Sequence, residues 1–294
     1  MNSSKVDNAI IMAAGLSSRF VPLSLEKPKG LLKVNGEILI ERQIRQLHEK
    51  GITDITVVVG YKKESFFYLK EKFGVKLVVN DYYDTKNNIE TLYLVRNSLK
   101  NTYICSSDDY FTTNPFSSFE EQSFYSSIHI THQSNEWYIE KDEDNNIKGV
   151  HISGREGDIM LGAVFFDENF SSSFVPLIEK AHSNKHYDDK LWEYLFIDNI
   201  ASLPKMKVRL FPDNTIFEFD SLEDLRFFDK KYIDNSESKI MENIAKTLNC
   251  SEGALSSFAL LKNEDENFSF EFEFNKTKYI YEGDKTNYTI KAKV

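Results

Sequence analysis

The sequence predicts an α/β protein built on a Rossmann-like, doubly wound mixed sheet, followed by a small α+β segment. Three observations carry this prediction. Short apolar runs alternate with helical segments up to residue 107, and glycine or polar residues follow each apolar run. From residue 124 onward, apolar runs succeed one another across short polar connections. The alternation is typical of parallel sheets, whereas closely spaced strands indicate an added antiparallel part.

The first part of the chain is expected to hold four strands and three helices. One helix, at 38–50, places Ile40, Ile44 and Leu47 on one face and ends at Gly51. The strands are predicted at 8–13, 54–59, 76–80 and 102–107, and the other helices at 63–73 and 89–99. Ligands of such sheets bind beyond the carboxyl ends of the strands, so the loops after residues 13, 60, 80 and 107 are expected to line the site.

The remainder is predicted to form a mixed part of the sheet and then a separate C-terminal segment. Strands are expected at 124–132, 147–153, 159–167, 206–211 and 215–219, and helices at 169–183, 189–200 and 221–232. A polar stretch at 234–238 indicates a boundary, which gives a domain at 1–235 and an extension at 236–294. In the extension we expect a helix at 238–248 and strands at 267–274, 277–282 and 287–292. Its length is too small for a substantial core.

Composition limits the classes of protein that the chain can represent. Of 294 residues, 41% are hydrophobic and 14% aromatic, which is enough for a sizeable core. The formal charge of −10 argues against a nucleic-acid partner but permits a small anionic ligand, which a few local charges can hold. Two cysteines are too few for a disulfide framework, and no apolar stretch reaches membrane-spanning length. We therefore expect a cytoplasmic protein without a membrane partner, either a monomer or a homodimer.

The most informative segment follows the first strand. The apolar run 9–12 ends in Ala13, Ala14 and Gly15, and Arg19 and Lys29 follow. A glycine loop after a strand lets the backbone N–H groups approach an anion, and Arg and Lys add full charges. The alternative is a buried strand with a solvated turn, because an isolated glycine-rich loop is a weak signal.

This segment resembles the signature of the nucleotidyltransferase family that includes the sugar-nucleotide pyrophosphorylases. That signature reads roughly G-x-G-x-R, a Pro, and then P-K. Arg19, Pro22, Pro28 and Lys29 match it, whereas Ser17 stands where the second Gly is usual. The resemblance implies the nucleotide-diphospho-sugar transferase type of sheet and a nucleotide substrate.

Carboxylates follow the fourth strand and recur further along the chain. Asp108 and Asp109 lie at a strand end, where they could hold Mg²⁺ together with substrate phosphates, or form an ordinary turn. Asp188 and Asp189 precede the helix expected at 190–200 and could cap it. Asp189 could also be a metal ligand, presented beside Trp192 by one helical turn.

Two tryptophans, Trp137 and Trp192, complete the candidate site. Aromatic rings attract cations through their negative faces, and quaternary ammonium groups are frequent targets. Each ring could equally be an ordinary packing residue, because the chain also holds 15 Tyr and 23 Phe.

Five short stretches resemble those of the bacterial CTP:phosphocholine cytidylyltransferases, the LicC group. They are Asn80-Asp81, Asn87-Asn88, Asp108-Asp109-Tyr110, Asn135-Glu136-Trp137 and Asp189-Lys190-Leu191-Trp192, and the similarity spans about residues 7–233. The resemblance implies a choline cage of Trp137 and Trp192, with Tyr110 or Tyr187 as further walls. It implies Mg²⁺ on Asp108 and Asp189, and cytidine contacts from the backbone of residues 13–15 and from Asn80 and Asn88.

The reaction that this resemblance implies is transfer of CMP from CTP to phosphocholine, with CDP-choline and pyrophosphate as products. Lys29, Arg19 and Asp108 are the expected catalytic residues. Three alternatives stay open: a cytidylyltransferase for 2-aminoethylphosphonate or phosphoethanolamine, a sugar-1-phosphate nucleotidylyltransferase, and a non-catalytic regulatory protein of the same fold.

The C-terminal extension resembles the opening strands of choline kinase-like proteins. Phe268-Ser269-Phe270 and the stretch 275–281 carry the resemblance. A Gly-Gly-x-x-Asn stretch of those proteins reads Asn263-Glu264-Asp265-Glu266-Asn267 here, and Glu282 replaces a basic residue. The kinase catalytic lobe is absent from the sequence, so we expect no kinase activity.

Overall fold

A computed structural model describes residues 3–264 and 267–293 of the chain. The chain forms two compact units, the first from the residues up to Gly15 and Leu39–Glu218, the second from Leu16–Ile38 and Phe219–Val294. The expected boundary between residues 235 and 236 lies inside the second unit. Two residues of the kinase-like stretch 263–267, Asp265 and Glu266, lie outside the described residues.

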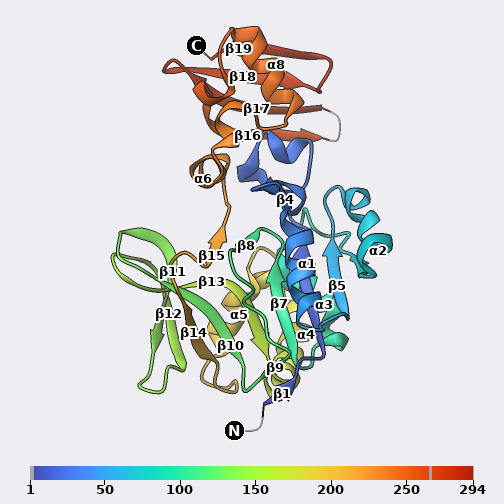
Figure 1. Ribbon diagram of the computed structural model, residues 1–294, viewed down its shortest axis with the longest axis vertical. Helices are drawn as coiled ribbons and strands as arrows, with labels where there is room; N and C mark the ends of the chain where they lie inside the picture. Colours follow the sequence, from blue (N-terminus) through green and yellow to red (C-terminus); the bar gives the residue numbers. More distant parts are fainter. Residues whose placement is uncertain (1–2, 265–266, 294) are drawn as a thin grey trace. The chain divides into compact units, whose positions relative to one another are not determined.

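The first unit is organised around a nine-stranded mixed sheet (Figure 1). Four of its strands are parallel and follow the predicted strands closely: β2 (Asn8–Ala13), β5 (Ile55–Val59), β6 (Lys76–Val79) and β7 (Thr102–Ser106). Their order is β7-β2-β5-β6, with β2 central, so the first of the predicted strands is paired on both sides. Parallel strands buried on both faces are expected to be almost wholly apolar, as β5 is.

The antiparallel part joins the sheet at β7. Strand β13 (Gly157–Phe166) pairs with β7, and β10 (Phe124–Ile130), β11 (Ser134–Lys141) and β12 (Ile147–Gly154) extend it. Strand β14 (Lys207–Phe211) pairs with β10 in the parallel direction. Two short pairs complete the unit's strands: β1 (Ser4–Lys5) with β9 (Phe119–Glu120), and β8 (Asp109–Phe111) with β15 (Ile216–Glu218). Strand β11 has no counterpart among the predicted elements, because half of its residues are polar and exposed.

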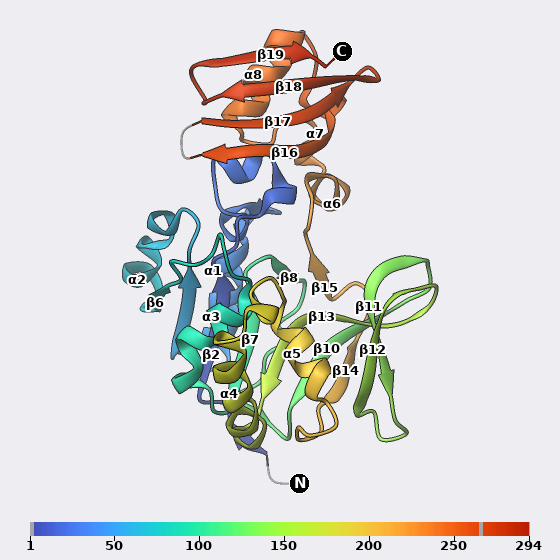
Figure 2. The same ribbon diagram turned by 180° about the vertical axis from the view of Figure 1, so that it is seen from behind.

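Helices cover both faces of the parallel strands. Helix α1 (Leu39–Glu49) lies on one face, and α3 (Asn88–Val95), α4 (Glu168–His182) and α5 (Trp192–Asn199) lie on the other (Figures 1 and 2). The helix predicted at 63–73 is divided at Phe67 into a 3₁₀ turn and α2 (Tyr68–Phe73). The main core joins Ile10 and Ile104 of the sheet to Leu92 of α3 and Phe174 of α4. No helix in the described ranges is both long and apolar enough to cross a bilayer.

The second unit contains a four-stranded antiparallel sheet of its own. Its strands are β16 (Ser256–Glu264), β17 (Asn267–Phe274), β18 (Thr277–Gly283) and β19 (Tyr288–Ala292), and α8 (Lys239–Leu248) lies against it (Figure 2). Its remaining elements are β3 (Lys33–Val34), β4 (Glu37–Ile38), α6 (Leu222–Phe228) and α7 (Lys231–Asp234). Alternate residues Phe268, Phe270 and Phe272 of β17 are buried, as are Ile240 and Ile244 of α8. The extension therefore has a small apolar core, which its length alone did not lead us to expect.

Candidate active site

The loops after the parallel strands are tied to one another at the carboxyl edge of the first unit's sheet. The Tyr61 N–H donates to the carbonyl of Ala14 at 3.1 Å, and the Ser107 N–H donates to the carbonyl of Met12 at 3.0 Å. Since all four strands run in the same direction, residues 13–15, Asn80 and Asp108 leave the sheet at this one edge. The sequence prediction of a shared edge is confirmed.

Glycine is required at one position of this edge. A Cβ atom on Gly60 would lie 2.7 Å from the Cβ of Tyr83 and 2.8 Å from the carbonyl oxygen of Ala14. The strand β5 must therefore pass close beneath the loop that follows β2. A Cβ on Gly15, by contrast, would meet nothing within 4 Å, so the backbone there borders open space. That is the environment expected of a backbone segment that approaches a ligand.

Asn80 and Asn88, both predicted to contact the nucleotide, take part in contacts within the protein. The Asn80 side chain is buried; its amide donates to Thr91 at 3.2 Å and its oxygen accepts from the Tyr82 N–H at 2.9 Å. The Asn88 side-chain oxygen accepts from the Trp192 N–H at 2.6 Å. Both side chains thus shape the loops around the sheet edge, and their contact with a nucleotide stays a prediction.

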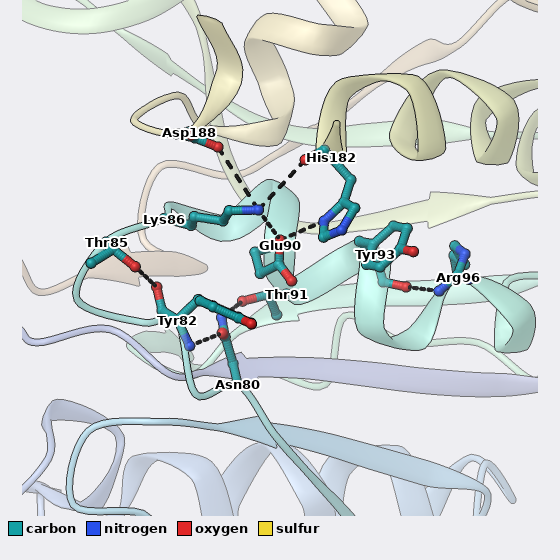
Figure 3. A network of polar contacts seen from close by, with 10 residues as sticks. All are labelled: Asn80, Tyr82, Thr85, Lys86, Glu90, Thr91, Tyr93, Arg96, His182 and Asp188. Atoms are coloured by element: carbon teal, nitrogen blue, oxygen red, sulfur yellow. Dashed lines mark hydrogen bonds and ion pairs between the residues drawn. The ribbon is translucent and has the colours of Figure 1, made fainter. Parts of the chain in front are cut away.

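A polar network anchors the loop that joins β6 to α3 (Figure 3). The buried carboxylate of Glu90 accepts from Lys86 Nζ at 3.1 Å and lies 2.7 Å from His182 Nδ1. Lys86 Nζ also lies 3.9 Å from a carboxylate oxygen of Asp188. A buried carboxylate is stable only when it is paired, and here its partners are His182 of α4 and Lys86 of the loop before α3. Lys86 in turn links Glu90 to Asp188 in the loop before α5. The network therefore fixes the segment that carries Asp189 and Lys190.

Asp108 meets an acidic residue that the sequence analysis missed. Carboxylate oxygens of Asp108 and Glu218 lie within 4.8 Å of each other. Strand β15 brings them together, because it pairs antiparallel with β8 and places Glu218 opposite Asp109. Two carboxylates at that separation can bind one hard cation, which takes oxygen ligands and keeps water or phosphate oxygens in its other positions. The donor set fits Mg²⁺.

Asp189 is placed differently. Its side chain is exposed, and its backbone carbonyl accepts from the Asn87 side chain at 3.0 Å. Within the described residues, Asp189 does not lie within 4.8 Å of both Asp108 and Glu218. The assignment of Asp189 as a metal ligand or as a substrate contact stays a prediction. Asp189 is not the N-cap residue of α5, because α5 begins at Trp192 and its N-cap residue is Leu191.

The ring of Trp192 lies in the core. Only 1% of the residue is exposed, and Tyr125, Phe166 and Phe174 pack around the indole with ring centroids 5.4–6.0 Å away. The expectation that Trp192 forms a wall of a choline cage does not fit this position, because an enclosed ring has no face left for a ligand. The cause is helical periodicity, since Trp192, Leu195 and Phe196 form the buried side of α5.

Trp137 is half-buried on β11 and contacts a different aromatic residue. Its ring meets Tyr194 of α5 edge to face, with centroids 4.8 Å apart. Tyr187, also half-buried, donates its hydroxyl to Asp198 at 3.0 Å. Tyr110 is buried, and the guanidinium of Arg42 already lies over its ring at 4.7 Å. Of the predicted cage residues, Trp137 and Tyr187 therefore keep accessible surface.

The two predicted phosphate-binding cations belong to the second unit and share one carboxylate. Arg19 Nη2 lies 2.9 Å and Lys29 Nζ 3.1 Å from the same oxygen of Asp220. Lys29 is buried, with 9% of the residue exposed, whereas the Arg19 side chain is 73% exposed. Two cations that share one carboxylate can exchange it for the oxygens of another anionic ligand.

Ser17 adopts the backbone conformation that favours the glycine of the family pattern. Its φ of 52° and ψ of 42° lie in the left-handed region, and its carbonyl accepts from the Phe20 N–H at 2.9 Å. A side chain there costs about 1–2 kcal/mol relative to glycine. The loop keeps the conformation that the pattern requires despite the substitution.

Glu218, Asp220 and Tyr194 are candidate site residues that sequence reasoning missed. The stretch 217–220 reads Phe-Glu-Phe-Asp, and this alternation of apolar and acidic residues could have indicated a second acidic strand end. Tyr194 could have been found from the helical spacing of α5, which separates it from the buried residues. Neither signal says which distant segment the residue meets.

Comparison with known proteins defines the class first. A model of the MobA-like NTP transferase domain matches residues 9–109, and with the sheet and its acidic edge it defines a nucleotidyltransferase. The chain is 40% identical over 218 residues to a choline-phosphate cytidylyltransferase of Streptococcus pneumoniae, covering 74% of this chain and 95% of that protein. It is 32% identical to a 2-aminoethylphosphonate cytidylyltransferase of Lancefieldella rimae, covering 77% and 93%. The solved structure of the Streptococcus pneumoniae CTP:phosphocholine cytidylyltransferase, LicC, superimposes with a TM-score of 0.73 at 39% identity, covering 76% of this chain and 97% of that one.

The chain belongs to the nucleotidyltransferase family of the bacterial choline-phosphate cytidylyltransferases. The resemblance inferred from the sequence motifs is thereby confirmed, as is the expected type of sheet.

Proposed function

We propose that this protein transfers the CMP group of CTP to phosphocholine and releases pyrophosphate. The observation that carries the proposal is the 40% identity to the choline-phosphate cytidylyltransferase of Streptococcus pneumoniae across 95% of that protein. We assign the reaction to residues 1–235, as the motifs indicate, and no kinase activity to residues 236–294.

The reaction needs positioning and charge neutralisation more than proton transfer. A phosphate oxygen of phosphocholine, already ionised, attacks the α-phosphorus of CTP in line; the new P–O bond forms as the bond to the β-phosphate oxygen breaks, and pyrophosphate leaves. Lys29 neutralises charge at the α-phosphate, and Arg19 holds the departing pyrophosphate. Both cations exchange Asp220 for substrate phosphates. Backbone groups of residues 13–15 contact the nucleotide.

Asp108 and Glu218 are suited to hold a divalent metal ion, and we infer that it is Mg²⁺. When bound, the ion supplies positive charge to the reacting phosphates. The two carboxylates keep that charge at the edge of the first unit's sheet where the nucleotide loop begins. Removal of divalent ions by EDTA should abolish pyrophosphate release, and added Mg²⁺ should restore it. Activity that persists in EDTA would contradict the metal assignment.

The proposal is tested by measuring pyrophosphate release from each nucleoside triphosphate with each candidate acceptor. We expect turnover with CTP and phosphocholine. Lys29→Ala should lower kcat/KM by about 10²–10³-fold, the usual loss when one charge-stabilising donor is removed. Lys33→Ala is the matched control, since Lys33 is an exposed lysine that pairs with Glu237. Equal activity of the two variants would contradict the role of Lys29.

A second acceptor has specific support. The relative from Lancefieldella rimae acts on 2-aminoethylphosphonate and is 32% identical over 93% of its length. Its acceptor carries a primary ammonium, which needs hydrogen-bond acceptors more than aromatic faces. Faster turnover of 2-aminoethylphosphonate than of phosphocholine in the same assay would reassign the substrate and leave the reaction class unchanged.

A further inference from the structure

Two aromatic rings of the first unit lie beside a lysine side chain, and a third ring contacts one of them. We call Trp137, Tyr187 and Tyr194 the aromatic cluster; all three are half-buried. Lys190 Nζ lies 5.3 Å from the ring centroid of Tyr187 and 5.6 Å from that of Tyr194. Trp137 contacts Tyr194 from β11, with centroids 4.8 Å apart. At these distances an ammonium is attracted by the ring faces, so the cluster holds a cation that belongs to the protein itself.

No carboxylate in the described part of the chain forms an ion pair with Lys190. Its ammonium instead lies 2.6 Å from His186 Nε2. An ammonium has three donors and no acceptor, so the imidazole accepts through an unprotonated Nε2. The lysine is therefore held only by two ring faces and one neutral acceptor. Such an arrangement can be exchanged at low cost for contacts with water.

We propose that Lys190 occupies the subsite for the cationic group of the acceptor and must leave it before the acceptor binds. This inference rests on the proposed function, because it assigns the aromatic cluster to the ammonium of phosphocholine. Two cations cannot share the same ring faces, since they repel each other in a partly desolvated site. The ammonium of Lys190 and the cationic group of the acceptor thus cannot occupy the aromatic cluster at the same time.

Competition of this kind lowers the apparent affinity for the acceptor. The apparent dissociation constant of the acceptor is inversely proportional to the fraction of molecules in which the subsite is open. An attraction of about 0.5–1 kcal/mol for each ring face at a partly exposed site predicts a reduction of about five- to thirtyfold for the two faces together. Lys190 thereby acts as a selectivity residue, because only an ammonium that gains more from the cluster than lysine does can displace it.

The opposite role for Lys190 would be direct binding of the acceptor's phosphate. The two roles predict opposite effects of removing the lysine charge on the affinity for the acceptor. Neutralising a competitor strengthens binding of the acceptor, whereas neutralising a phosphate ligand weakens it. A ligand that has the cation but no phosphate separates them further, since a phosphate ligand would not affect it.

The test uses the full chain and measures binding of choline and of tetramethylammonium by calorimetry. Lys190→Met keeps the apolar stem and removes the charge, so both ligands should bind about five- to thirtyfold more tightly. The KM for phosphocholine should fall by a similar factor, with the KM for CTP unchanged. Lys190→Arg keeps a cation, and Lys185→Met removes an exposed lysine outside the cluster; both should bind choline as the unaltered chain does.

Unchanged or weaker choline binding in Lys190→Met would overturn the inference. Lys190→Gln, a polar neutral variant, gives the same comparison if Lys190→Met does not fold. Tyr194→Leu should weaken choline binding in the Lys190→Met background; no effect there would place the subsite elsewhere and also overturn the inference. Failure of the proposed function is distinguishable, because the unaltered chain would then release no pyrophosphate with phosphocholine, whatever the behaviour of the Lys190 variants.

Discussion

The carboxyl group of Glu193 should make the stability of this protein depend on pH. Burial raises its pKa to about 7 from an ordinary value of 4.5, although hydrogen bonds from its own backbone, Tyr125 and Asn88 oppose the change. One oxygen accepts from the Tyr125 hydroxyl at 3.2 Å, while Oε2 is enclosed without a hydrogen-bond partner in the described part of the chain. The residue as a whole is half-buried, whereas its carboxyl group is enclosed. The protonated form is thus the stable one in the fold.

The sign and size of the effect follow from proton linkage. The folded chain binds this proton more tightly than the unfolded chain, so the contribution is fully present below pH 4.5 and is lost as the pH rises to about 7. The two pKa values differ by about 2.5, and one pKa unit corresponds to about 1.4 kcal/mol. The contribution of Glu193 to the free energy of unfolding therefore changes by at most about 3 kcal/mol. Above pH 7 the fold carries the full cost of a buried, half-paired carboxylate.

Glu193→Gln removes the titration while keeping the size of the side chain and an oxygen for Tyr125. We expect the variant to gain up to about 3 kcal/mol over the unaltered chain at pH 8, and most of that gain to be absent at pH 5. Urea unfolding at both pH values measures the difference. Glu121→Gln, which neutralises an exposed glutamate, is the control. A difference between Glu193→Gln and the unaltered chain that is the same at pH 5 and pH 8 would refute the reasoning.

Two further predictions separate packing from binding. Trp192→Ala should lower the free energy of unfolding by about 3–5 kcal/mol, as expected for a buried tryptophan, whereas Trp137→Ala should change stability little and raise the KM for phosphocholine without affecting that for CTP. Thermal unfolding together with steady-state kinetics tests both, and a stable Trp192→Ala protein would contradict the buried position. Ser17→Gly should stabilise the protein by about 1 kcal/mol or less, because glycine removes the left-handed strain but has more freedom in the unfolded chain. A lower melting temperature would contradict this expectation.

Much of the fold was accessible from local sequence patterns. The strands at 8–13 and 55–59 and the helix at 39–49 have the period that their burial requires, and the structure places them within a residue or two of the prediction. Strand β11 escaped prediction because half of its residues are polar and exposed. Strand β16 was missed although it contains the apolar run 258–261. Each of the two strands pairs with the strand that follows it in the sequence.

The candidate site was only partly accessible. The phosphate loop, Arg19, Lys29 and Asp108 follow from residue types at fixed local spacing, since each stands directly after a strand or within one loop. The choice of tryptophan was less reliable, because residue type does not say which side of a helix faces the core. Trp192 faces it and Tyr194 does not, although they are two positions apart.

By itself, the sequence determined the class of sheet, the edge at which the candidate site lies and the charges that we expect to serve a triphosphate. These depend on strand polarity and on short motifs, which are local properties of the chain. Only the tertiary structure decided that Glu218 stands beside Asp108, more than a hundred positions away, and that Trp137 of β11 contacts Tyr194 of α5. The physical reason is that strand pairing and helix packing bring together distant segments, and no local pattern records which ones meet.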